Sequence, residues 1–197
     1  MKIYKGWGAF AERCEYLLPD IELAVEKLTG ETIPVSYDLS DKKLLGEFPD
    51  EYLYALKRVA AHLQMGGKLP EKSFIEDIES SEEDEELLGY IDSYEKGFKY
   101  GSLVFFSETV GVYLPVKGLD EPIHFEHEDR NIEMCSIGSL YALKRDLEEL
   151  KKALEGKAQG EFDENIPWHI EREILEKLLK WTNEAIEEKK PLVLVGE

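Results

Sequence analysis

Residues 139–156 read SLYALKRDLEELKKALEG, the most regular stretch of the chain. Its leucines stand at positions 140, 143, 147, 150 and 154, a spacing of three and four residues that places them on one face of a helix. Ser136 or Ser139 can cap the start of this helix, and Gly156 can end it. An intermolecular coiled coil needs about three or four heptads, and this pattern lasts for two. The pattern therefore predicts a helix over 139–155 whose leucines pack in the protein's own core, with dimerisation through them as the alternative.

Four apolar runs predict strands. Residues 103–106 (LVFF) and 110–116 (VGVYLPV) are separated by three residues, which favours a β-hairpin. Pro115 cannot donate a ladder hydrogen bond, so we expect the second of these strands at an outer position. Residues 122–125 predict a third, short strand. The run 191–195 (PLVLV) has no polar alternation, which predicts a central strand covered on both faces.

Helical spacing and breaker residues predict further helices on both sides of this strand region. They cover 7–18, 20–29, 49–65 and 167–188, and a β-branched segment at 32–37 adds a short edge strand. Helices thus come first, strands lie in the middle, and helices return before one last strand. This order favours a single α+β domain over 1–197, in which several amphipathic helices pack on a small mixed or antiparallel sheet containing a central hairpin.

The composition excludes several classes of protein. The 197 residues include 43 acidic and 24 basic side chains, so the formal net charge is −19 at pH 7. This charge is opposite to the one needed to bind a phosphate backbone, so we expect no nucleic-acid partner. Hydrophobic residues make up 43% of the chain, which is enough to bury a core. No apolar run is long enough for a membrane span or a signal peptide, which favours a cytoplasmic protein with no membrane partner.

The negative charge is concentrated in two segments. Residues 76–86 hold eight acids and no base, and residues 120–133 hold six acids and Arg130. Like charges repel at helical spacing, so we expect 76–86 to be an exposed acidic loop or a frayed helix. A concentrated acidic surface speeds the encounter with a basic partner, although improved solubility would explain it too. The predicted partner-binding residues are Glu82, Glu83, Asp84, Glu85, Glu86, Glu126, Glu128 and Asp129.

Residues 124–129 bring together two histidines and three acids, which are residue types that bind divalent metals. On a strand, however, His124 and Glu126 share one face and His127 lies on the other. No second pair of ligands stands out, so we predict no metal and no cofactor. Cys135 precedes the predicted helix, where the helix dipole can lower a thiol pKa, and a nearby histidine could act as its base.

The remaining candidates favour ordinary structural roles. Residues 136–139 lack the glycine pattern of a phosphate-binding loop and are explained by a helix cap. His62 and His169 have no recognisable nucleophile partner, so we expect them to be core or surface histidines. Cys14 and Cys135 are expected to be buried and reduced.

These observations favour an acidic protein-binding or regulatory module that neutralises a basic protein such as a toxin or nuclease. We predict no catalytic residues. The alternative is a small metal-assisted or thiol hydrolase with a site around residues 124–139.

Overall fold

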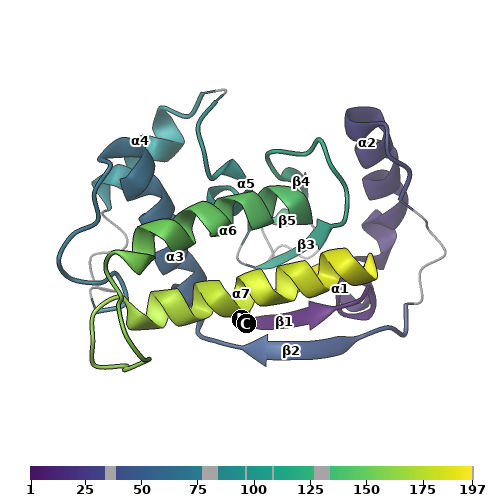
Figure 1. Ribbon diagram of the computed structural model, residues 1–197. Helices are drawn as coiled ribbons and strands as arrows, with labels where there is room; N and C mark the ends of the chain where they lie inside the picture. Colours follow the sequence, from purple (N-terminus) through teal and green to yellow (C-terminus); the bar gives the residue numbers. More distant parts are fainter. Residues whose placement is uncertain (34–38, 77–83, 96, 108, 127–133, 197) are drawn as a thin grey trace.

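A mixed six-stranded sheet with helices against both of its faces confirms the α+β class (Figure 1). The computed structural model describes residues 1–33, 39–76, 84–95, 97–107, 109–126 and 134–196. Its strands are β1 (Lys2–Lys5), β2 (Lys43–Glu47), β3 (Val110–Leu114), β4 (Ile123–Glu126), β5 (Met134–Ser139) and β6 (Leu192–Val195). Its α-helices are α1 (Gly8–Cys14), α2 (Leu18–Thr29), α3 (Asp50–Met65), α4 (Glu85–Asp92), α5 (Gly101–Val104), α6 (Leu140–Glu155) and α7 (His169–Glu188), and a 3-10 helix, η1 (Glu15–Leu17), joins α1 to α2.

The sheet has the strand order β2-β1-β6-β3-β5-β4. Strand β6 lies between β1 and β3 and is antiparallel to both, and all four of its residues are buried. This confirms the prediction that the last apolar run is a central strand. Strand β4 confirms the short strand expected at 122–125 and pairs antiparallel with β5. The strand predicted at 32–37 falls largely outside the described residues.

The hairpin predicted from residues 103–106 and 110–116 is wrong. Leu103 and Val104 belong to the short helix α5, and β3 pairs with β5 and β6 instead. A short apolar run cannot reveal by its periodicity whether it forms a strand or a buried helical turn. Here tertiary contacts hold the turn, because the Ser102 hydroxyl donates to Asp146 at 2.6 Å and the Ser102 carbonyl accepts from the Tyr113 hydroxyl at 2.9 Å.

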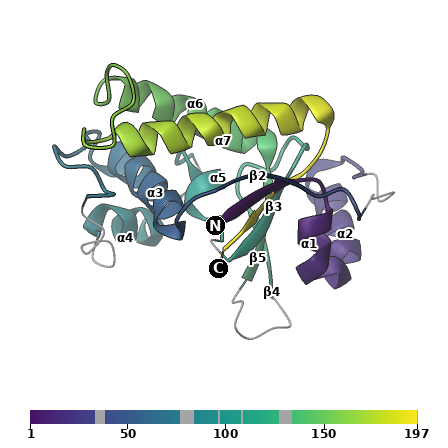
Figure 2. The ribbon, with the colours of Figure 1, turned by 90° about the horizontal axis from the view of Figure 1, so that it is seen from below.

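Strand β3 also lies inside the sheet rather than at its edge, which corrects the expectation drawn from Pro115. The proline follows the last residue of the strand, so its missing N–H interrupts no ladder bond. The side chains of β3 alternate between the two faces of the sheet. Val110 and Val112 face the core under α1 and α2, whereas Tyr113 faces the core under α3, α6 and α7. Figure 2 shows the sheet between these two groups of helices.

The helix predicted at 139–155 is confirmed as α6. The Ser139 hydroxyl caps it by accepting hydrogen bonds from the backbone N–H groups of residues 141 and 142. Its five leucines are all buried in the larger core cluster, so they contribute to the protein's own core. The other predicted helices correspond to α1, α2, α3 and α7. None of the helices in the described part of the chain is long and apolar enough to cross a membrane.

Candidate functional site

The first acidic segment, 76–86, continues with further acids and no bases as far as residue 95. From 76 to 95 the sequence contains ten acids and no lysine, arginine or histidine. Glu82 and Glu83 lie outside the described residues, and the chain is described again from Asp84, immediately before α4. Glu85 and Glu86 therefore begin a helix, so for these two residues the structure shows the second of the two expected forms rather than a loop. Acids in a first helical turn interact favourably with the helix dipole, which offsets their mutual repulsion.

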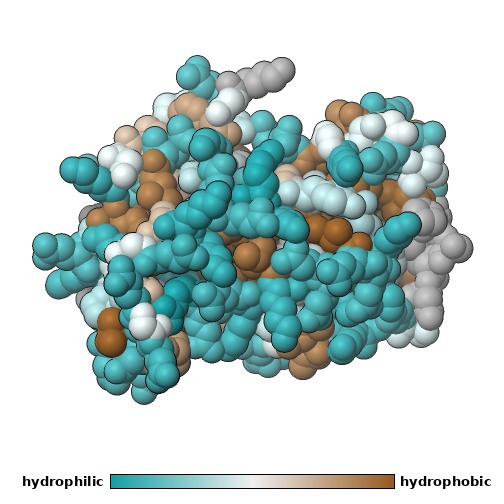
Figure 3. Space-filling model, viewed as in Figure 1, coloured by the Kyte–Doolittle hydropathy of each residue, from teal (hydrophilic) through white to brown (hydrophobic). Residues whose placement is uncertain are grey.

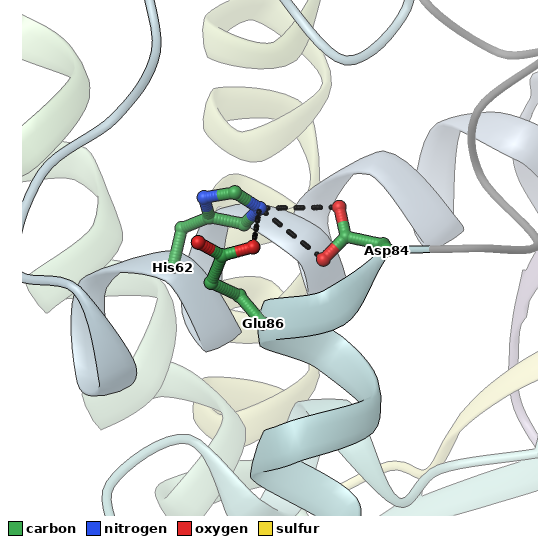
Figure 4. A group of neighbouring side chains, drawn as sticks. All are labelled: His62, Asp84 and Glu86. Atoms are coloured by element: carbon green, nitrogen blue, oxygen red, sulfur yellow. Dashed lines mark hydrogen bonds and ion pairs between the residues drawn. The ribbon is translucent and has the colours of Figure 1, made fainter.

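Asp84 anchors this helix to α3. One carboxylate oxygen, Oδ1, accepts a hydrogen bond from the backbone N–H of Leu87 at 2.9 Å, so Asp84 is the N-cap of α4. The other, Oδ2, accepts from Arg58 Nε at 2.6 Å, and His62 Nε2 lies 3.1 Å from it (Figure 4). The Arg58 guanidinium in turn stacks 4.2 Å from the ring centre of Phe74. With 6% of its surface exposed, Asp84 is not a surface charge, which corrects its predicted role in partner binding.

The surroundings of Asp84 keep its carboxylate ionised. Burial alone raises the pKa of this group, because it disfavours the charged form. The hydrogen bonds from His62, Arg58 and the Leu87 N–H outweigh that effect and lower the pKa to about 2. The buried pair with Arg58 is therefore an ion pair at neutral pH.

His62, Asp84 and Glu86 are the described residues that could together hold a metal ion, since their ligand atoms lie within 4.8 Å of one another (Figure 4). Glu86 Oε2 is 3.6 Å from His62 Nε2. A metal here would have to share Asp84 with the Arg58 guanidinium, which already balances that carboxylate. We therefore assign these three residues to the attachment of α4. Sequence reasoning missed the group, because His62 and Asp84 are far apart in the chain.

The outer side of α4 presents unpaired acids. Glu85 and Asp92 are exposed on the helix, Glu95 is exposed just after it, and Glu86 is half-buried beside His62. Within the described part of the chain, no lysine or arginine forms an ion pair with any of these four. The charges of Glu85, Asp92 and Glu95 are therefore directed to solvent.

Tertiary structure brings the second acidic segment to the first. Tyr94, two residues beyond α4, lies close to Glu121, because a Cβ added at Gly101 would be 2.9 Å from the Tyr94 hydroxyl and 3.3 Å from Glu121 Cγ. Burial and the neighbouring Glu121 carboxylate both raise the pKa of the Tyr94 hydroxyl, so the hydroxyl stays protonated beside that carboxylate. Asp120 is also exposed and pairs with Arg145 at 2.6 Å. We call the group formed by these two segments the acidic face; its members are Glu85, Glu86, Asp92, Glu95, Asp120 and Glu121.

The other predicted acids lie along or beyond β4. Glu126 is exposed at the end of this strand, and Glu128 and Asp129 lie outside the described residues. His127 lies outside them too. Of the two histidines and three acids in the predicted cluster, the structure therefore describes His124 and Glu126.

The thiol predicted as a candidate nucleophile is buried in β5. A hydrogen bond with Cys14 and burial both raise the pKa of Cys135, which keeps the thiol protonated and unreactive. His124 Nδ1 lies 3.0 Å from the hydroxyl of Ser136, so it pairs with that group. Both cysteines are free and buried, as predicted, and the fold makes them neighbours despite their distance in sequence. The geometry therefore gives no support to the thiol hydrolase.

Two further candidates have structural explanations. Residues 136–139 form the end of β5, and its last residue, Ser139, is the predicted helix cap, since it caps α6. A Cβ at Gly138 would lie 2.6 Å from the ring of Tyr113, so close packing of a strand explains this glycine. His169 is buried, accepts from the Asp163 N–H and lies 3.1 Å from the Gln159 carbonyl, which confirms it as a satisfied core histidine.

Comparison with known proteins identifies one family. Residues 12–194 match the model of a family described as "Putative DNA-mimic protein". The matched range begins within α1 and ends within β6, so it includes both acidic segments and every strand of the sheet except β1 and the last residue of β6. No curated protein and no solved structure matches the chain.

Proposed function

The chain belongs to this DNA-mimic family, and we propose that its acidic face takes the place of DNA on the surface of a DNA-binding protein. The observation that carries the proposal is that the two acidic segments meet where Tyr94, just beyond α4, and Glu121 lie together beside Gly101. A DNA duplex presents rows of phosphates, and a protein that binds it supplies lysines and arginines to meet them. Carboxylates held on a folded surface can meet the same basic groups.

The attachment of α4 supports this role. Glu85 and Asp92 are seven residues apart on the helix, which is about 10 Å along its axis and comparable to the rise of about three base pairs. Because Asp84 ties the start of α4 to Arg58, these charges are held in place before a partner arrives. Charges that are already ordered cost less entropy on binding than charges on a flexible chain.

We propose that the partner is a basic DNA-binding protein, such as a nuclease or a DNA-binding toxin, and that the protein neutralises it without catalysis. We assign Asp84 to holding α4. The proposed contacts are the members of the acidic face, which include Glu85 and Glu86, together with Glu82, Glu83, Glu126, Glu128 and Asp129.

Competition with DNA tests the proposal. A helix-turn-helix repressor, a histone-like nucleoid protein and a DNA-cutting nuclease would each be bound to a fluorescent duplex, and this protein would be added. We expect it to release the duplex from at least one of them, with weaker competition as salt is raised, since the interaction is between charges. Fluorescence anisotropy measures the release.

Two variants that each remove three charges can show whether binding depends on the acidic face or only on the total negative charge of the protein. The variant Glu85→Gln, Asp92→Asn, Glu95→Gln removes three charges of the acidic face. The control Glu155→Gln, Glu161→Gln, Glu187→Gln removes three exposed charges elsewhere. We expect the first variant to compete about tenfold less well and to associate more slowly, and the control to behave like the native protein. The proposal would be overturned if the protein released DNA from none of the three probe proteins. It would also be overturned if the two variants competed with DNA equally well.

A further inference from the structure

Helix α4 exposes two large apolar side chains among its acids. Leu88 is 50% exposed and Ile91 is 46% exposed. They are three residues apart, so they are neighbours on one face of the helix. Glu85 precedes Leu88 by three residues and Asp92 follows it by four, so the acids border this pair. Figure 3 shows hydrophobic residues among hydrophilic ones over the part of the surface where α4 lies in Figure 1.

The exposure of this pair is a consequence of how α4 is held. Leu87 and Tyr90, on the adjoining side of the helix, are buried, and the Tyr90 hydroxyl donates to the Lys99 carbonyl. The N-cap contact of Asp84 with Arg58 fixes the start of the helix. Turning α4 to bury Leu88 and Ile91 would expose Tyr90 and break these contacts.

We infer that Leu88 and Ile91 are an apolar anchor for a basic partner surface that carries an apolar patch. The inference rests on the proposed function and deepens it by specifying the partner's chemistry. Between its phosphate rows, DNA presents base edges, and DNA-binding proteins contact them with polar and apolar groups, including groups that meet the thymine methyl. On this protein, Leu88 and Ile91 lie between acids in the same way, so the partner's apolar groups can pack on them.

Charge complementarity favours this occupant over a second copy of the chain. Each copy has a net charge of −19, and two acidic faces brought together would repel. A basic surface is attracted instead. Apolar contact also adds affinity that salt does not screen, which charges alone cannot supply.

Two peptides of equal length and equal lysine content test the anchor independently of DNA. One carries leucines along a helical face, and the other has serines in their place. We expect the leucine peptide to bind the native protein about tenfold more tightly, which corresponds to about 1.4 kcal/mol. Isothermal titration calorimetry at low and moderate salt gives the two dissociation constants.

Variants on two helices locate the effect. Leu88→Gln with Ile91→Gln should abolish the preference for the leucine peptide and leave the affinity for the serine peptide unchanged. Glutamine forms helices well, and circular dichroism would check that the fold is kept. The control is Leu23→Gln with Leu28→Gln on α2, where these leucines are 50% and 61% exposed, and it should retain the preference.

Equal affinities of the native protein for the two peptides would overturn the inference, and so would a preference that survives the α4 variant or is lost in the α2 control. The DNA competition assay is a separate readout. If it fails while the α4-dependent preference is found, the proposed function is lost and the anchor stands. If DNA is released and the preference is absent, the proposed function stands and the anchor is rejected.

Discussion

Asp84 is the residue on which the position of the acidic face depends. Its carboxylate caps α4, balances the buried guanidinium of Arg58 and lies within hydrogen-bonding distance of His62. A buried ion pair of this kind adds little net stability compared with apolar residues of the same shape, but removal of one partner leaves a buried charge uncompensated. Asp84 thus links the start of α4 to two side chains of α3.

Asp84→Asn should lower the free energy of unfolding by about 3–5 kcal/mol at neutral pH, because Arg58 is left buried without its counter-charge. Asparagine is itself a good N-cap, so loss of the cap contributes little. Urea unfolding measures the change. The exposed neighbour provides the control, and Glu85→Gln should change stability by less than about 0.5 kcal/mol.

The same variant gives a pH dependence with a definite sign. The folded pKa of Asp84, about 2, is below the reference value of 3.8, so folding favours the ionised form. Its contribution is present above the unfolded pKa and is lost as the pH falls through the folded pKa. The stability gap between native protein and Asp84→Asn should therefore narrow by about 2 kcal/mol between neutral pH and pH 2. A gap that stays constant over this range would show that Asp84 is not held as a carboxylate.

At the scale of elements, the leucine spacing in the sequence of α6 matches the face that this helix buries. Its leucine face packs in the core shared with α7 and the sheet, and its N-cap, Ser139, is the last residue of β5. The chain therefore passes directly from a strand into the helix that covers it. The Ser139 hydroxyl also donates to the Val116 carbonyl, just beyond β3, and this bond ties the start of α6 to the neighbouring strand.

Leu147→Ala should destabilise the protein by about 2–5 kcal/mol, because it leaves a cavity in a fully buried part of the core. Chemical denaturation of the variant provides the measurement. Lys152→Ala, on the exposed side of the same helix, should cost less than about 0.5 kcal/mol. A similarly small effect for Leu147 would mean that the leucine face does not support the core.

At the scale of the molecule, the protein combines a sheet covered by helices on both faces with a strongly uneven charge distribution. Helix α4 packs on α3 at a distance from the sheet, so its acids lie at the periphery (Figure 2). A net charge of −19 destabilises the compact state through self-repulsion. A binding role would account for a surface that is kept at this cost.

The melting temperature should therefore rise with salt. Between low and physiological ionic strength we expect a gain of about 1 kcal/mol, or roughly 2–4 °C for a chain of this size. The variant Glu85→Gln, Asp92→Asn, Glu95→Gln should melt at the same temperature as the native protein or higher in low salt, and it should respond less to added salt. Differential scanning calorimetry measures these melting temperatures. A native melting temperature that falls with added salt would contradict the view that self-repulsion of its charges destabilises the protein.

Short-range patterns in the sequence were enough to predict most helices and one decisive strand. The periodicity and breaker residues of α2, α3, α6 and α7, and the unbroken apolar run of β6, all act within a few residues of one another. The concentration of acids at 76–86 was also readable directly from composition. Strands β1 and β2 were missed because each is four or five residues long with lysines inside it, which gives little apolar signal.

The sequence by itself determined the α+β class, the central last strand and the acidic character of the surface, because these depend on local periodicity and on counting charges. Only the tertiary structure decided that residues 103–104 are helical, that Asp84 is buried, and that Tyr94 joins the acidic segments. Each of those outcomes depends on contacts between residues far apart in the chain, such as Asp84 with Arg58 or Tyr94 with Glu121. No local pattern encodes such contacts, because they form only when packing of the core has brought the elements together.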